Sequence, residues 1–200
     1  MGVLAAFAAT AAVAQPALAD AVLAELNRAR ADPQAYAQTL RQYRGYISPK
    51  DKVARIPNDP VGRITVEGAV GVDEAIAFVL AQQPLPPLQQ SDILAAAALD
   101  HANEQGPTGA LGHNSASGLT PGERVMRRGG GKFVGEIIAY GSSDALSVVR
   151  QFIIDDGVPA RGHRALIFEP RLIYAGIGCA PHRTFRTVCV GDMGQSPDGK

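Results

Sequence analysis

The chain has 200 residues, with 19 acidic and 19 basic side chains and a formal net charge of zero at pH 7. This length suits a single domain with its own hydrophobic core. Because no run of Lys or Arg stands out, nucleic acid is not expected as a partner. No stretch after the N-terminus is long and apolar enough for a transmembrane helix, so no membrane span is expected in the mature chain.

The N-terminal segment, residues 1–19, is rich in Ala and Val and ends in the small residues Ala17 and Ala19. This pattern is typical of a secretory signal peptide that is cleaved before Asp20. No Lys or Arg precedes the apolar run, which leaves an incomplete leader or an Ala-rich first helix as alternatives. We therefore predict a secreted or periplasmic protein with one domain over residues 20–193.

The first half of the domain is expected to be helical. Apolar residues at helical spacing predict one broken helix or two short helices over 21–44, with Asp32 as an N-cap before Pro33. Residues 45–65 are rich in Gly, Pro and polar side chains, which predicts an irregular insertion.

Two further helices are expected before the middle of the chain, over residues 71–81 and 92–104. Ser91 is the expected N-cap of the second helix. His101 lies on the apolar face of that helix, among Ala and Leu. A packed core or rim histidine is the favoured interpretation, and a metal ligand is the alternative.

The next short helix begins with a capping box, in which Thr120 is the N-cap and Glu123 is the third helical residue. We therefore expect Thr120 and Glu123 to support the fold. Glycines at 129–131 should end this helix. A role for Glu123 in chemistry is the weaker alternative.

A strand is expected over residues 132–141, with Glu136 inside it. Carboxylates are disfavoured in strands, so Glu136 should have a specific partner. The partner could be Arg124 or Arg164 in a salt bridge, or Glu136 could face a functional cleft.

The following helix should begin at the N-cap Asp144 and end at Asp155 and Asp156. Acids at a helix C-terminus are unfavourable because they face the negative end of the helix dipole. Their presence indicates a tertiary partner, for which His163, Arg161 and a bound cation are candidates.

A hairpin is expected from strands at 173–180 and 185–192, with its turn near Thr184. Cys179 and Cys189 lie symmetrically about that turn, so paired strands would bring them within disulfide distance. Export would favour oxidation. Two reduced, buried thiols are the alternative.

His182 lies in the predicted turn and is expected to face solvent. Residues 194–200 are expected to form a loose tail. Helices early in the chain and strands late in it predict an α+β fold.

The most specific pattern in the chain runs from Gly112 to His163. It consists of Gly-His-Asn-Ser at 112–115, Gly-Glu-Ile-Ile-Ala at 135–139 and Gly-His-Arg at 162–164. The order of these motifs resembles the CAP superfamily, which comprises the cysteine-rich secretory proteins, antigen 5 and the pathogenesis-related proteins. The same unit is also called the SCP domain, and the likeness is closest to the secreted bacterial members.

The resemblance assigns the family's cleft tetrad to His113, Glu136, Asp155 and His163. Ile137 stands where the family usually has Asn, and Asp155 stands where many members have Glu. The resemblance also implies a three-layer α-β-α sandwich with a small, mainly antiparallel central sheet.

The resemblance implies a binding function, because CAP domains bind divalent cations in some members and sterols, fatty acids or peptides in others. We expect His113 and His163 to ligate the cation, and zinc suits imidazole best. The expected partner is an extracytoplasmic lipid, peptide or protein, and the chain is expected to be a monomer.

Two alternatives to a non-enzymatic binding module remain open. One is a hydrolase that uses Ser115 or Ser117 beside His113, or a metal-activated water with Glu136 as the base. Neither serine lies in a G-x-S-x-G motif. The other alternative is a buried network in which the four residues of the tetrad only stabilise the fold.

Overall fold

The computed structural model describes residues 15–57 and 59–200. Most of the predicted signal peptide, residues 1–14, lies outside the described residues. Its last residues, from Pro16 to Ala19, form the first turn of helix α1 (Pro16–Ala31), and Ala19 is buried in the core. In the part of the chain that the structure describes, no helix is both long and apolar enough to cross a membrane.

The predicted helical start consists of two helices, α1 and α2 (Pro33–Arg44). They are separated at Asp32, whose side chain accepts a hydrogen bond of 2.8 Å from the backbone of Ala35. Pro33 then occupies the first helical position, where a missing N–H costs nothing. The break in the helix therefore lies where the sequence predicts it.

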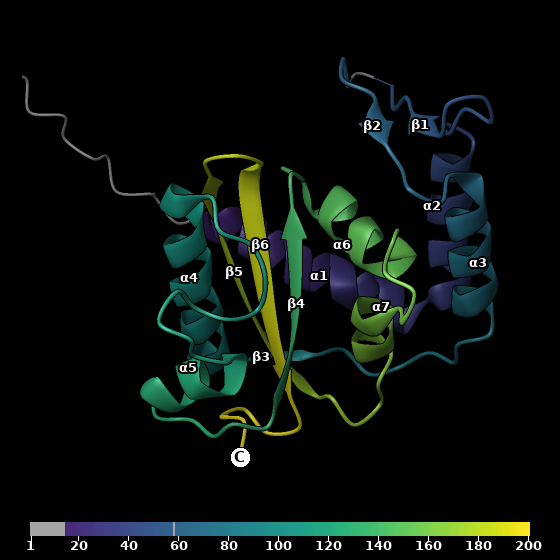
Figure 1. The fold of residues 1–200 in the computed structure, drawn as a ribbon. Helices are drawn as coiled ribbons and strands as arrows, with labels where there is room; N and C mark the ends of the chain where they lie inside the picture. The colour runs from purple at the N-terminus through teal and green to yellow at the C-terminus, as the bar shows by residue number, and fades with distance from the viewer. Residues whose placement is uncertain (1–14, 58) are drawn as a thin grey trace, which may run out of the picture.

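The central sheet has four strands in the order β3-β5-β6-β4 (Figure 1). Their bounds are β3 (Gln89–Gln90), β4 (Val134–Tyr140), β5 (Tyr174–His182) and β6 (Arg186–Gly194). Only the two-residue strand β3 runs parallel to its neighbour, so the sheet is mainly antiparallel. The sequence did not predict β3.

Helices cover both faces of this sheet and form the three-layer α-β-α sandwich that the resemblance implies (Figure 1). One face carries α4 (Asp92–Thr108) and α5 (Pro121–Arg127). The other carries α1, α6 (Ala145–Ile154) and α7 (Gly162–Ile167), with α2 and α3 (Ala69–Leu80) packed on each other beyond them. The larger apolar cluster lies on this second side, and two smaller clusters lie beneath α4 and α5.

Two glycines of β5 let α4 approach the sheet closely. A Cβ added at Gly176 would overlap the backbone of Leu94 and Ala95, and one added at Gly178 would overlap the backbone of Leu99. The backbone of α4 therefore packs directly on the strand, without a layer of side chains between them.

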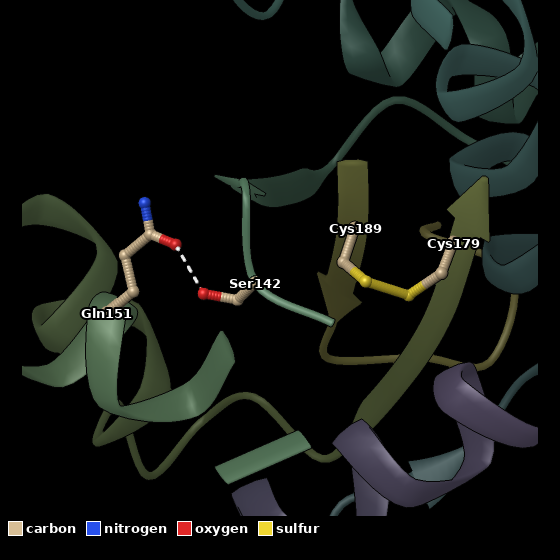
Figure 2. The surroundings of a disulfide bond; sticks show 4 residues. All are labelled: Ser142, Gln151, Cys179 and Cys189. Carbon is tan, nitrogen blue, oxygen red and sulfur yellow. Dashed lines mark hydrogen bonds between the residues drawn. A yellow bond between two sulfur atoms is a disulfide. The ribbon is translucent and has the colours of Figure 1, made fainter. Parts of the chain in front are cut away.

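The predicted disulfide between Cys179 and Cys189 is confirmed (Figure 2). The two residues are register partners on β5 and β6, with their Cα atoms 4.2 Å apart. β5 extends two residues further toward the turn than predicted, so the hairpin turn is short and lies at residues 183–185.

Two expectations about the C-terminal region are wrong. His182 is buried, and both of its ring nitrogens have partners. Its Nδ1 accepts backbone hydrogen bonds from Thr184 and Phe185, and its Nε2 donates to the carbonyl of Ala110. Residues 194–200 are docked and do not form a loose tail. The backbone N–H groups of Gly131 and Phe133 donate to the carbonyls of residues 198 and 199, at 2.6 and 2.9 Å.

The predicted insertion, residues 45–65, contains the short antiparallel strands β1 (Val53–Ala54) and β2 (Arg63–Ile64). The two residues directly after it are fixed to the loop that follows α6. The carboxylate of Asp156 accepts backbone hydrogen bonds from Val66 and Glu67, at 2.7 and 2.8 Å. The insertion is thereby held against the sandwich.

Candidate functional site

The first half of the predicted tetrad is a pair formed by His113 and Glu136. Glu136 lies on β4 with its side chain almost fully buried, and its Oε1 lies 2.8 Å from Nδ1 of His113. A carboxylate can only accept, so Nδ1 of His113 is the donor and the lone pair of the neutral ring is on Nε2. The His113 side chain is 51% exposed, which leaves that lone pair accessible.

The second half is a pair formed by His163 and Asp155. Oδ1 of Asp155 lies 2.6 Å from Nδ1 of His163, and its Oδ2 accepts the backbone N–H of the same residue at 3.0 Å. Asp155 occupies the C-cap of α6 in a left-handed conformation, φ 56°, which orients its carboxylate toward α7. Asp156 does not compete for this place, because it binds the backbone of the insertion.

The imidazole rings of His113 and His163 lie next to each other and so bring the two pairs together. Their ring centroids lie 6.4 Å apart, with 35° between the ring planes. His163 also packs against Phe152, at 5.7 Å between centroids. The structure therefore brings together all four residues that the motifs identify, as two carboxylate–histidine pairs.

Arg124 is a further member of this group. It forms a buried ion pair with Oε2 of Glu136 and donates to the carbonyls of His113 and Leu119, at 2.8 and 3.2 Å. The salt bridge to Arg124 that the sequence offers as one reason for a carboxylate in the strand is therefore present, and Glu136 also binds His113. Arg164, the other arginine considered, pairs with Glu74 at 3.1 Å.

The helix that carries Arg124 is fixed by the capping box. Thr120 Oγ1 accepts from the backbone of Glu123, and Oε2 of Glu123 accepts from the backbone of Thr120 at 2.8 Å. Both residues support α5 and, through Arg124, the buried carboxylate of the tetrad.

A second group of polar side chains positions the loop that carries His113. His101 is fully buried on α4, with its Nε2 at 2.9 Å from the carbonyl of Gly112. Gln105 donates to the same carbonyl, and the hydroxyl of Tyr140 accepts the N–H of Gly112 at 2.9 Å. His101 is thus the packed core histidine that the sequence favours.

Asp192 is a residue of this site that the sequence did not reveal. It lies on β6 directly opposite Glu136 and is fully buried. In the described part of the chain, neither of its carboxyl oxygens has an N–H or O–H partner. Burial raises the pKa of Asp192 well above its usual range, and the charge of Glu136 raises it further, against a smaller effect of Arg124.

Asp192 could have been identified from the pairing register of β4 and β6. A second acid, on the strand paired with the one that holds Glu136, would have been recognised as its neighbour. That pairing joins residues 56 positions apart in the sequence, and local patterns do not specify it.

The serines considered as nucleophiles are not activated in this arrangement. Among the described residues, no hydrogen bond joins the hydroxyl of Ser115 or Ser117 to His113 or His163. The Nδ1 atoms of both rings are occupied by carboxylates, and Ser115 is buried.

The donor set fits a divalent cation through two imidazoles. Among the described residues no carboxylate contacts either Nε2 atom, while Glu136 and Asp155 orient the rings through Nδ1, as carboxylates bonded to metal-binding histidines do. Across residues 15–57 and 59–200, no group of three or more His, Cys, Asp or Glu side chains is placed to hold a metal. Water or another ligand would have to complete the coordination.

Solved structures of other proteins resemble parts of the chain. The solved structures that resemble the chain include an extracellular protein with a SCP domain from Bacillus anthracis, 18% identical, with a TM-score of 0.45, covering 63% of this chain and 38% of that one. They also include an outer surface protein from Borrelia burgdorferi, 20% identical, with a TM-score of 0.45, covering 55% of this chain and 77% of that one. No curated protein matches the chain.

The sequence pattern of the family described as the cysteine-rich secretory protein family, CAP, matches residues 23–193. This range includes the tetrad, the disulfide and the central sheet up to the last residue but one of β6. The chain therefore belongs to the CAP family of cysteine-rich secretory proteins.

Proposed function

We propose that this protein is an extracytoplasmic binding module that holds a divalent cation, preferably zinc, between His113 and His163. The observation that carries this proposal is the pair of buried carboxylates, each of which fixes one imidazole through Nδ1. Such an arrangement sets the tautomer and leaves both Nε2 lone pairs available to a cation. A cation bound there would supply positive charge and open coordination positions for a further ligand.

Binding without catalysis is favoured because the tetrad lacks a free base. Oε1 of Glu136 is bonded to His113, and its Oε2 is in the ion pair with Arg124. Neither oxygen is free to take a proton from water. Among the described residues no serine hydroxyl contacts either ring, so nucleophilic catalysis has no assembled group to use.

We place the protein outside the cytoplasm, either released or in a periplasm. The disulfide between Cys179 and Cys189 supports this location, because such bonds persist in oxidising compartments. The chain is proposed to act as a monomer.

The test is calorimetric titration of zinc into the full chain, compared with the His113→Ala/His163→Ala double variant. A matched control is Glu25→Gln, which removes an acid on α1, where Glu25 pairs with Arg28. We expect micromolar binding in the wild type and the control, and its loss in the double variant. No zinc binding by the folded wild type would refute the proposal. A double variant that loses stability but binds zinc like the wild type would make the tetrad a structural network.

A further inference from the structure

A cavity of about 380 Å³ lies beside the His163 and Asp155 pair. Its walls come from α6, from the end of β4, from the loop over residues 155–163 and from residues 63–65 of the insertion. This volume is in the range of small-molecule sites in proteins. Asp155 and His163 line it while His113 and Glu136 do not, so the cavity adjoins the position between the two histidines on the His163 side.

Arg150 is the group in this cavity that the fold leaves uncompensated. It lies on α6 and is 8% exposed, and its guanidinium is stacked on the ring of Tyr43 at 4.1 Å. It donates one side-chain hydrogen bond, to Ser147 Oγ at 3.0 Å. Within the described residues no carboxylate lies within ion-pair distance of it, although a guanidinium carries five N–H donors.

The acids that line the cavity are already engaged. Asp155 holds His163, and Asp156 accepts two backbone N–H groups of the insertion. Arg63 adds a second guanidinium to the wall, 3.2 Å from Asp59. Among the described residues, Arg150 is therefore the lining arginine that has no ion pair.

The rest of the cavity wall is mixed. Ser142 and Gln151 supply polar groups to it, and Figure 2 shows the hydrogen bond between them. Apolar side chains cover much of the remaining surface, namely Val72, Ile138, Phe152, Ile154 and Val158. A bound ligand would thus contact both the buried guanidinium of Arg150 and apolar side chains.

We propose that this cavity binds a compact organic monoanion, with its carboxylate held by Arg150 and its apolar part against Ile64 and Val158. A planar carboxylate matches the forked donors of a guanidinium, and Tyr43 fixes the guanidinium plane. A single uncompensated guanidinium balances one negative charge. A phosphate dianion would also face Asp155 and Asp156, which disfavours it.

The proposal also gives the insertion a role. Residues 63–65 form one wall, and the bonds of Asp156 to Val66 and Glu67 hold that wall in place. Glu67 is further tied to Arg161 at 2.5 Å. The insertion therefore encloses a ligand site, and the site requires no metal.

The test is titration of benzoate into the full chain in the presence of a metal chelator, with benzamide as the uncharged ligand of the same shape. Arg150→Gln removes the charge, and Arg41→Gln is the control, because Arg41 is an exposed arginine on α2 outside the cavity. We expect benzoate to bind the wild type and the control, and to bind Arg150→Gln at least about tenfold more weakly. Benzamide should bind the wild type more weakly than benzoate does.

Two further measurements keep the result decisive. Val158→Trp fills the cavity from its loop wall, so it should abolish benzoate binding even if Arg150→Gln fails to fold. The His113→Ala variant should retain benzoate binding, because His113 does not line the cavity, and this separates the site from the proposed cation site. Equal benzoate affinity in the wild type and in folded Arg150→Gln, or tighter binding of inorganic phosphate than of benzoate, would overturn the proposal.

Discussion

Glu136 and Asp192 face each other across β4 and β6, both buried, with Arg124 beside Glu136. One arginine cannot compensate two carboxylates in this environment, and the pKa of Asp192 is raised accordingly. A neutral Asp192 adds no second negative charge, so Glu136 keeps the charge that orients His113. The acid that orients His113 therefore belongs to a buried group of three residues, Glu136, Asp192 and Arg124.

The first prediction concerns pH and Asp192. Because its carboxyl has a higher pKa in the folded protein than in the unfolded chain, its contribution to stability is present at low pH and is lost as pH rises through the folded pKa. The pH range over which this stability is lost lies above the pKa of an aspartate in the unfolded chain, about 3.9. Asp192→Asn cannot ionise, so it should raise the free energy of unfolding at pH 8 by on the order of 1 kcal/mol or more.

Urea unfolding of Asp192→Asn and the wild type at pH 5 and pH 8 checks this expectation. The gain should be larger at pH 8 than at pH 5. Asp20→Asn, at an exposed acid of α1, serves as the control and should show no such difference. An identical pH dependence in Asp192→Asn and the wild type would show that Asp192 does not titrate in this way.

The second prediction concerns Arg124. Arg124→Met leaves Glu136 buried without its cation and releases the carbonyls of His113 and Leu119. Breaking one side of a buried ion pair costs about 3–5 kcal/mol, so the variant should be strongly destabilised. Adding Glu136→Gln should recover part of that loss, because the uncompensated charge is then gone. A double variant less stable than Arg124→Met, measured by thermal unfolding, would contradict this interpretation.

The tetrad could be predicted from the sequence because its motifs are local. Each of His113, Glu136 and His163 lies next to glycines within a short pattern, and the family resemblance assigns the rest. The disulfide followed from the symmetry of two cysteines about one turn. The three-layer sandwich came from the same resemblance, while composition and periodicity gave only the α+β class.

The features that the sequence missed depend on long-range packing. Asp192 matters only because β6 pairs with β4, and Arg150 only because its helix faces the insertion. His182 has the local pattern of a turn residue, yet the carbonyl of Ala110, 72 positions away, completes its hydrogen bonds. The docked tail likewise depends on backbone contacts with residues 131 and 133.

The third prediction concerns the disulfide. Cys179 and Cys189 close a short loop, and a bond of this separation stabilises a fold by about 2–3 kcal/mol through the unfolded state. The Cys179→Ala/Cys189→Ala variant should lose about that much in urea unfolding. A reductant should lower the stability of the wild type and leave the double variant unchanged, because the chain has no other cysteine. Equal sensitivity of both proteins to the reductant would contradict the prediction.

The fourth prediction concerns the packing of α4 on β5. Gly178→Ala adds a Cβ that overlaps the backbone of Leu99, so the helix must shift away from the sheet. Such overpacking costs about 1–3 kcal/mol. Gly162→Ala is the matched control, since a Cβ there meets nothing within 4 Å, and it should change stability by less than about 0.5 kcal/mol. Equal melting temperatures for the two variants would show that α4 can adjust without cost.

The last prediction separates orientation from ligation at His163. Asp155→Asn keeps the shape of the side chain but removes the charge that fixes Nδ1 of His163 as the donor. If Asp155 orients a metal ligand, zinc affinity should fall by about 10–100-fold. Zinc binding by calorimetry checks this, with Asp156→Asn as the control, because that acid holds the insertion and not the ring. Zinc affinity that is unchanged in Asp155→Asn but lost in His163→Ala would mean that the imidazole binds metal without help from the carboxylate. Loss of affinity in both aspartate variants would instead indicate that the whole loop after α6 is disturbed.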